Sequence, residues 1–250
     1  MLAMGAAAVL ACHASVTIGR HLGNSPINVN WIHDMSAVFM EFKDISESTP
    51  NEVWQVERIA GHHYAAAADF ALEHLKGSGK CLIAGSPLFE LYELDTRYEI
   101  TYVDFREPPL NGFRFVRADA CAIPLEDESF DALSSTCLLC HIGLGRYGDP
   151  ERLAGDQVAL KEFWRVLKSG AVAAVTLGPV AEINQSQQVG SAHRVYTFDD
   201  ARRIVEHAGF TMEASAVWDT RGERWRRRDE RINIDPALFP DYLSMALRKD

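Results

Sequence analysis

The sequence lacks the marks of a membrane-spanning or secreted protein. Its apolar opening, from Met1 to Cys12, is too short to cross a bilayer, and no lysine or arginine precedes it as a secretory signal requires. We therefore expect an N-terminal helix in a cytoplasmic protein that has no membrane partner. Positive charge is also scarce: the formal net charge is -10, which disfavours binding of nucleic acid through the whole surface.

The sequence also lacks the two cysteine pairs that a typical zinc site requires. Of the five cysteines, only Cys137 and Cys140 have C-x-x-C spacing, and no second pair accompanies them. Reduced structural thiols in a cytosolic protein fit this pattern better than a zinc or redox site. The carboxylates Asp131, Asp149 and Asp156 are too scattered among the predicted elements for a metal-assisted mechanism. We therefore predict no metal site.

One basic cluster stands out against this acidic background. Five arginines between Arg221 and Arg228 interleave with Trp225. Acidic residues accompany them, so we interpret the cluster as a solvated face, with a local site for an anion or a partner as the alternative.

The chain holds no internal repeat, but its pattern changes near residue 80. Before that point apolar residues recur at helical spacing, for example after Thr49-Pro50, so we expect residues 1–79 to form a helical extension or lid. From Lys80 onward, short apolar runs alternate with helical stretches. This alternation predicts a Rossmann-like α/β domain over residues 80–250, with a mostly parallel sheet.

The same pattern predicts the individual elements. Asp149-Pro150 opens a helix over residues 151–167, and a capping-box pattern from Thr197 starts another helix that ends at Gly209. Two last strands, near residues 211–218 and 242–247, are expected to pair antiparallel at the edge of the sheet. The five strands expected before them are residues 81–84, 100–103, 113–116, 130–134 and 171–177.

Glycine or polar residues follow the first strands, at the place where an open α/β sheet binds its ligands. Gly85, followed by Ser86, lets the chain turn sharply and lets a ligand approach the backbone. Asp104 lies nineteen residues after Gly85 and could accept both hydroxyls of a ribose. Asp119, after the third strand, could accept from the amino group of an adenine. Their order predicts a nucleoside site.

Further motifs follow in the same order. Phe130-Asp131-Ala132-Leu133 comes after Ala118-Asp119-Ala120, and Phe163–Gly170 is similar to the helix-to-strand joint "RVLKPGG". The sequence thus resembles the class I S-adenosylmethionine-dependent methyltransferases from about residue 80 to residue 250. One glycine stands where that family usually holds two or three, and NAD binding by the same fold is the rival interpretation. The resemblance implies a transferase whose cofactor, S-adenosylmethionine, contacts Gly85, Ser86, Asp104, Asp119, Ala120 and Thr136.

A glycine-rich loop follows the fourth strand. Gly143–Pro150 reads Gly-Leu-Gly-Arg-Tyr-Gly-Asp-Pro, and His193-Arg194-Val195-Tyr196 lies downstream. Together they resemble a sub-family of methyltransferase-like proteins of unknown function in which this loop and a His-Arg-x-Tyr motif recur. That resemblance implies a fold and a donor, not an acceptor. The structural alternative is a tight turn leading to a helix capped by Asp149.

The loop is expected to lie beside the methyl group of the donor. Histidines there could act as bases for a hydroxyl or protonated amine, with ordinary structural histidines as the alternative. Guanidinium groups could hold a carboxylate, and aromatic faces attract a sulfonium; plain helix packing is the alternative for the tryptophan. The predicted catalytic residues are His141, Arg146, Tyr147 and His193. The predicted substrate-binding residues are Trp31, Arg194 and Tyr196.

Three functional hypotheses remain open from the sequence. The first is a methyltransferase for a small molecule in secondary-metabolite or surface-sugar biosynthesis, with a homodimer as the expected assembly. In the second, S-adenosylmethionine is itself the substrate, and cyclisation of its aminobutyrate arm releases methylthioadenosine. The third is a non-catalytic module that binds the nucleoside and regulates a partner.

Overall fold

The computed structural model describes residues 62–85, 94–107, 113–181, 185–191, 193–219, 224–226 and 241–250. All of them belong to the unit Met40–Asp250. The helices expected before residue 62, Trp31 and Ser86 lie outside the described residues. The described helices are α2 (His62–His74), α4 (Gly155–Val166) and α5 (Phe198–His207). The strands of the main sheet are β1 (Gly79–Ala84), β2 (Tyr98–Asp104), β3 (Arg114–Arg117), β4 (Phe130–Thr136), β5 (Leu167–Val180), β8 (Phe210–Asp219), β9 (Arg224–Trp225) and β10 (Asp241–Lys249).

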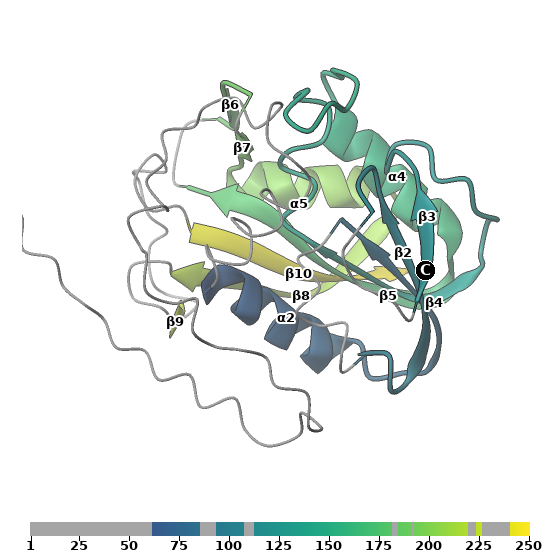
Figure 1. The fold of residues 1–250 in the computed structure, drawn as a ribbon. Helices are drawn as coiled ribbons and strands as arrows, with labels where there is room; N and C mark the ends of the chain where they lie inside the picture. Colours follow the sequence, from purple (N-terminus) through teal and green to yellow (C-terminus); the bar gives the residue numbers. More distant parts are fainter. Residues whose placement is uncertain are drawn as a thin grey trace, which may run out of the picture. The chain divides into compact units, whose positions relative to one another are not determined.

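The strands of this sheet follow the order β3-β2-β1-β4-β5-β10-β8-β9 (Figure 1). From β3 to β5, every neighbouring pair is parallel. β10 is antiparallel to both of its neighbours, β5 and β8. The predicted fold class, a Rossmann-like and mostly parallel sheet with antiparallel strands at one edge, is therefore confirmed. Five parallel strands place their carboxyl ends along one edge, where the predicted ligand residues fall.

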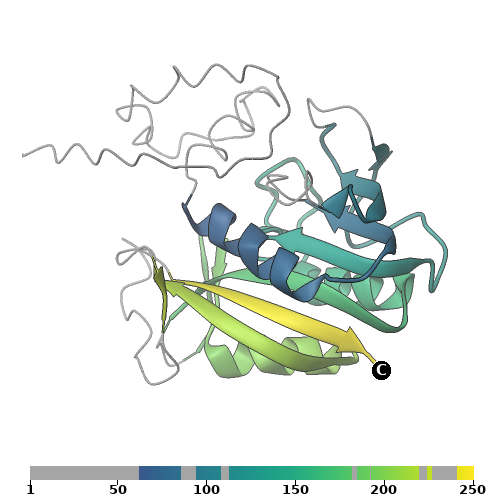
Figure 2. The same ribbon diagram turned by 90° about the horizontal axis from the view of Figure 1, so that it is seen from below.

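Alternate residues of the strands enter different apolar clusters. In β1, Leu82 and Ala84 pack in a cluster with residues of α4 and α5, whereas Cys81 and Ile83 pack in another with residues of α2. Helices therefore cover both faces of the sheet (Figure 2). Because both faces are buried, the strands need apolar side chains in both directions, and this explains their continuous apolar runs.

The helix after the glycine-rich loop differs from the prediction at both ends. α4 begins at Gly155, with Ala154 at its N-cap and no side-chain capping bond. The expectation that Asp149 caps this helix was wrong. Its carboxylate instead accepts hydrogen bonds from the backbone N–H groups of Gly143, at 2.7 Å, and Tyr147, at 3.2 Å. At the other end the chain turns directly into β5 at Leu167, because this residue already has an extended backbone.

The second predicted helix is confirmed. The side chain of Thr197 caps α5 by accepting a hydrogen bond from the backbone N–H of Asp200, at 3.0 Å. Acidic residues in the first turn suit the positive end of the helix dipole. Gly209 follows the helix with φ of 101°, a conformation that glycine adopts without strain, and β8 begins with the next residue.

The arginine-rich segment is partly structural. Arg226 donates from Nε to Asp241 at 2.8 Å and pairs through Nη2 with Asp219 at 3.3 Å. Both carboxylates are buried, and the Arg226 side chain is 15% exposed. The interpretation of the cluster as a solvated face was therefore wrong for Arg226. Its ion pairs link Asp219, at the end of β8, with Asp241, at the start of β10.

A small second sheet escaped the sequence analysis. β6 (Gln187–Val189) pairs antiparallel with β7 (His193–Val195). The backbone N–H of Arg194 donates to the carbonyl oxygen of Cys140 at 2.8 Å, which brings the His-Arg-x-Tyr motif against the glycine-rich loop. Within the described part of the chain, no helix is long and apolar enough to cross a membrane.

Candidate functional site

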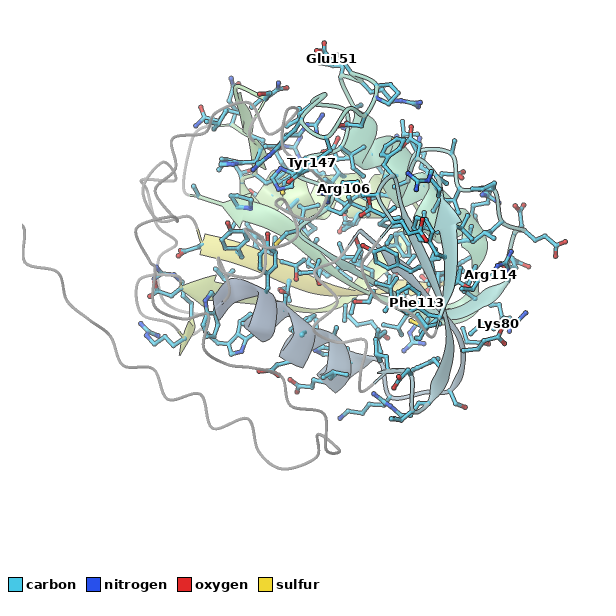
Figure 3. The ribbon with its side chains drawn as sticks, viewed as in Figure 1. Lys80, Arg106, Phe113, Arg114, Tyr147 and Glu151 are labelled. Carbon is cyan, nitrogen blue, oxygen red and sulfur yellow. The ribbon has the colours of Figure 1, made fainter. Side chains whose placement is uncertain are left out.

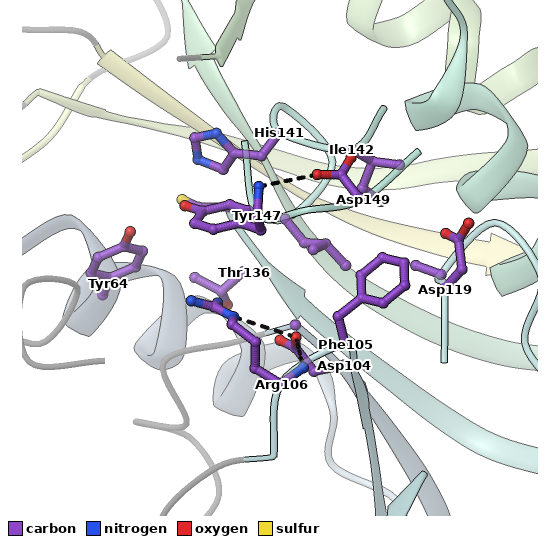
Figure 4. Close-up of a pocket in the computed structure, with 14 residues that line it drawn as sticks. Tyr64, Asp104, Phe105, Arg106, Asp119, Thr136, His141, Ile142, Tyr147 and Asp149 are labelled. Carbon is purple, nitrogen blue, oxygen red and sulfur yellow. Dashed lines mark hydrogen bonds and ion pairs between the residues drawn. The ribbon is translucent and has the colours of Figure 1, made fainter. Parts of the chain in front are cut away.

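A pocket lies at the carboxyl ends of the parallel strands (Figure 4). Gly85 follows β1, Asp104 ends β2, Asp119 comes shortly after β3 and Thr136 ends β4. Segments far apart in the sequence thus meet because the strands that carry them are parallel neighbours. The described residues that line the pocket are Tyr64, Gly85, Asp104, Phe105, Arg106, Asp119, Ala120, Thr136, Cys137, Leu138, His141, Ile142, Tyr147 and Asp149.

The predicted residues divide into two groups. Of the expected cofactor residues that the structure describes, all line the pocket, and so do two of the expected catalytic residues, His141 and Tyr147. The other four predicted residues within the described chain lie outside the lining: Arg146, His193, Arg194 and Tyr196.

Gly85 is required by its surroundings. Its φ is 47°, in the left-handed region that glycine favours. A Cβ atom at this position would lie 2.6 Å from Cδ1 of Leu138, which lines the same pocket. Any side chain here would strain the turn after β1 and collide with the residues that follow β4.

Asp104 is a buried carboxylate at the floor of the pocket. Its Oδ1 accepts a hydrogen bond from the backbone N–H of Arg106 at 2.9 Å, and its Oδ2 accepts one from the hydroxyl of Tyr102 at 3.2 Å. Burial raises the pKa of the Asp104 carboxyl, and the nearby guanidinium of Arg106, with Nε 3.7 Å from Oδ1, partly opposes this effect. A further hydrogen bond donated to this carboxylate, for example by a ligand, would therefore stabilise its charged form.

Asp119 stands at the other end of the pocket lining. Its Oδ1 accepts a hydrogen bond from the backbone N–H of Cys121 at 2.8 Å. Its Oδ2 accepts one from Nη2 of Arg152 at 3.1 Å. A carboxylate offers about four acceptor positions, so each oxygen can still accept from a ligand.

Phe105 and Arg106 were missed by the sequence analysis. They directly follow Asp104, so their position after a strand end was the signal that could have identified them. The guanidinium carbon of Arg106 lies 4.6 Å from the ring centroid of Tyr147, and the two labelled residues lie near one another in Figure 3. The guanidinium carbon of Arg146 lies 5.3 Å from the same centroid. Tyr147 therefore makes its cation contacts with two arginines.

The glycine-rich loop has a defined shape. Gly143, Gly145 and Gly148 all have positive φ, at 76°, 70° and 79°. These angles let the loop fold back so that Asp149 reaches the backbone of Gly143 and Tyr147. The shape of the loop thus has a physical basis in three left-handed glycines and one bridging carboxylate.

Two histidines and an arginine form a cluster at the base of this loop. Nη1 of Arg146 lies 3.4 Å from Nδ1 of His141. The ring centroids of His141 and His193 are 6.4 Å apart, and those of His141 and Tyr147 are 5.7 Å apart. Burial lowers the pKa of His193, and the positive charge of Arg146 lowers it further. His193 is therefore neutral at neutral pH, as a base must be.

Arg194 and Tyr196 form hydrogen bonds with residues that flank the glycine-rich loop. Arg194 donates from Nη1 to the carbonyl oxygen of Ile142 at 2.6 Å and from Nη2 to that of Arg152 at 3.2 Å. The Tyr196 hydroxyl donates to Asp156 at 3.0 Å. Both residues are buried, and these contacts position the loop rather than line the pocket.

Tyr64 and Cys137 are two further pocket residues that the sequence analysis did not select. Tyr64 comes from α2, and no local pattern distinguishes it from the other residues of that helix. Cys137 has φ of 54° directly after β4, an uncommon conformation for a residue with a Cβ atom.

The described cysteines are buried thiols. Cys81, Cys121, Cys137 and Cys140 form no disulfide with one another. Burial raises the pKa of the Cys121 and Cys140 thiols to about 12, so neither is a thiolate at neutral pH. Across the described residues, no group of three or more histidine, cysteine, aspartate or glutamate side chains has the arrangement of a metal site.

Residues 77–175 match the family model described as a methyltransferase domain. This part of the chain is therefore similar to a methyltransferase domain. The match runs from β1 into β5 and includes the whole loop Gly143–Pro150. No curated protein matches the sequence at a significant level. The finer resemblance, to the sub-family with the Gly-Leu-Gly-Arg-Tyr-Gly-Asp-Pro loop, remains a prediction.

Solved structures share the fold at low sequence identity. One is the 1,6-didemethyltoxoflavin-N1-methyltransferase of Burkholderia thailandensis, bound to 1,6-didemethyltoxoflavin and S-adenosylhomocysteine. It is 17% identical, covers 80% of this chain and 81% of its own, and has a TM-score of 0.56. Another is the cyclase SpnF, which is 18% identical, with coverage of 74% and 80% and a TM-score of 0.53. These two neighbours show that the chain shares their fold.

Proposed function

We propose that the protein is an S-adenosylmethionine-dependent methyltransferase that acts on a small molecule. The observation that carries this proposal is the convergence of Gly85, Asp104, Asp119 and Thr136 on one pocket at the carboxyl ends of parallel strands. The methyltransferase-domain match over residues 77–175 supports it independently.

The residues present fit the nucleoside part of the donor. Asp104 keeps acceptor capacity on Oδ2 beyond its bond from Tyr102, which suits a ribose hydroxyl. Phe105 lines the pocket beside it and offers an aromatic face to a purine. Asp119 then accepts from the amino group of the adenine. In this assignment His141 and the loop residue Tyr147 border the opposite end of the pocket, where the acceptor enters (Figure 4).

The donor supplies an electrophilic methyl group on a sulfonium. The task of this chain is then to hold the acceptor in line with that methyl group, since orientation provides much of the rate of such a displacement. Tyr64, Tyr147 and His141 border the space where the acceptor is placed. Arg146 stabilises His141 and Tyr147 by its contacts with both rings. His141, which lines the pocket, is the candidate base for an acceptor that must lose a proton.

The alternative chemistry keeps the pocket but not the methyl transfer. The fold of SpnF shows that a structure of this kind also serves a cyclase. A donor-consuming cyclisation and a non-catalytic nucleoside module both use the same Asp104 and Asp119. We further propose a biosynthetic role in the cytoplasm, as a homodimer, for the methyltransferase.

Product analysis separates these functions. The protein is incubated with S-adenosylmethionine labelled with ¹³C in the methyl group and with a small-molecule fraction, and the products are identified by mass spectrometry. Methyl transfer predicts S-adenosylhomocysteine together with a labelled small molecule. Methylthioadenosine in its place would establish the cyclisation, and donor recovered intact with every acceptor tested would favour the non-catalytic module. Heat-denatured protein serves as the control for spontaneous decay of the donor.

A further inference from the structure

Arg152 holds a residue of the proposed donor site although it does not line the pocket itself. Its Nη2 donates to Oδ2 of Asp119 at 3.1 Å, while Oδ1 of the same carboxylate accepts from the backbone N–H of Cys121 at 2.8 Å. One donor on each oxygen fixes both the rotation of the carboxylate and the direction of its remaining lone pairs. Asp119 is therefore held in one orientation from two sides.

The backbone that carries Arg152 is itself immobilised. Its N–H donates to the carbonyl oxygen of Gly143 at 2.9 Å, and its carbonyl oxygen accepts from Nη2 of Arg194 at 3.2 Å. A Cβ atom on Gly143 would lie 2.5 Å from that carbonyl oxygen, so only glycine permits this approach. Arg194 also holds the carbonyl oxygen of Ile142 at 2.6 Å. The guanidinium of Arg152 thus extends from a fixed point toward Asp119.

We propose that Arg152 positions Asp119 so that the pocket selects a purine with a 6-amino group over one with a 6-oxo group. This inference rests on the proposed function, because it assumes that the adenine of the donor lies beside Asp119. A carboxylate in a fixed orientation accepts from an amino group, whereas it faces the oxygen of a 6-oxo purine with its own lone pairs. When Asp119 can rotate away, that repulsion is relieved and the selection weakens.

The selection for a 6-amino purine is measured as the ratio of the affinities for two ligands. S-Adenosylhomocysteine and S-inosylhomocysteine differ at position 6 of the purine, and both are titrated calorimetrically into each variant. The unaltered protein should prefer the adenosyl compound by roughly tenfold or more, the range for a hydrogen bond to a charged acceptor. Arg152→Ala should reduce the preference severalfold, and Arg152→Lys should retain most of it, because an ammonium can still pair with Asp119.

Matched variants separate positioning from general damage. Arg203 is also an arginine in a partly exposed ion pair, with Asp200 on α5, so Arg203→Ala should leave the preference unchanged. The Arg152 side chain is 39% exposed, and a pair of this kind contributes little to stability. Arg152→Gln, which keeps most of the stem, replaces Arg152→Ala if the latter fails to fold.

A double-mutant cycle decides whether Arg152 acts through Asp119. Adding Arg152→Ala to Asp119→Ala should change the preference no further. An unchanged preference in Arg152→Ala, or additive effects in the double variant, would overturn the inference while S-adenosylhomocysteine binding still supports the proposed function. Binding of neither ligand by the unaltered protein would overturn both.

Discussion

Replacement of Asp104 by alanine should weaken binding of S-adenosylhomocysteine without unfolding the protein. The carboxylate lies at the end of β2, and its side chain is 9% exposed. Water therefore competes little for a hydrogen bond between this carboxylate and a ribose hydroxyl. Loss of hydrogen bonds to a charged acceptor costs ~1.5–3 kcal/mol. That range corresponds to an increase of about 10- to 150-fold in Kd.

Calorimetry of S-adenosylhomocysteine binding measures this change, with circular dichroism to verify the fold. Asp131→Ala is the matched control, because Asp131 is also an ion-paired aspartate but lies at the amino end of β4. It should leave Kd unchanged. Asp104→Asn, which keeps one acceptor oxygen, should fall between the unaltered protein and Asp104→Ala. A Kd for Asp104→Ala equal to that of the unaltered protein would show that Asp104 is a turn residue only.

The pH dependence of the same binding provides a second readout of Asp104. Since burial raises the pKa of this carboxyl above the usual value of 3.8, it takes up its proton at higher pH than an exposed aspartate does. Protonation replaces an acceptor with a donor, so affinity should fall as pH decreases through this raised pKa. In the Asp104→Asn variant, which has no carboxyl to protonate at this position, this decrease in affinity at low pH should disappear.

Three further variants test the loop and the turn. Arg146→Lys should keep the melting temperature but lose most release of S-adenosylhomocysteine in turnover assays, because an ammonium cannot reproduce the planar contacts with His141 and Tyr147; full turnover in Arg146→Ala would remove this residue from the mechanism. For His193, whose folded pKa is lowered by burial, the unfolded state binds the proton more tightly, so stability is lost as pH falls below about 6.5. His193→Gln should therefore show a smaller decrease in melting temperature below that pH, and equal decreases would contradict the assignment. Gly85→Ala places a Cβ atom 2.6 Å from Leu138 at a φ of 47°, and should lower both the melting temperature and donor affinity; affinity unchanged by calorimetry would argue against a close approach of the donor to this turn.

The sequence predicted those residues of the pocket lining whose position depends on strand order. Gly85, Asp104 and Asp119 could be found because each follows an apolar run, and parallel strands bring their carboxyl ends together. The capping threonine of α5 could be found because its partner, Asp200, is three residues away. Both kinds of inference depend only on local pattern and on the fold class.

Residues with distant partners could not be assigned in this way. Asp149 precedes a helix in the sequence, but its carboxylate accepts its hydrogen bonds from the backbone of its own loop. Arg226 stands among other arginines, yet it pairs with Asp241, fifteen residues further along the chain. Arg152 carries no motif, and its role follows only from a contact with Asp119 across 33 residues. Each of these assignments required the three-dimensional arrangement.

The pocket at the carboxyl ends of β1, β2 and β4 should bind the S-adenosyl group rather than a dinucleotide. Calorimetric titration of the protein with S-adenosylhomocysteine and, separately, with NAD distinguishes the two ligands. Binding of S-adenosylhomocysteine should be saturable and weakened by Asp104→Ala, with no heat of binding for NAD. Tight binding of NAD with no response to S-adenosylhomocysteine would refute the assignment of the pocket.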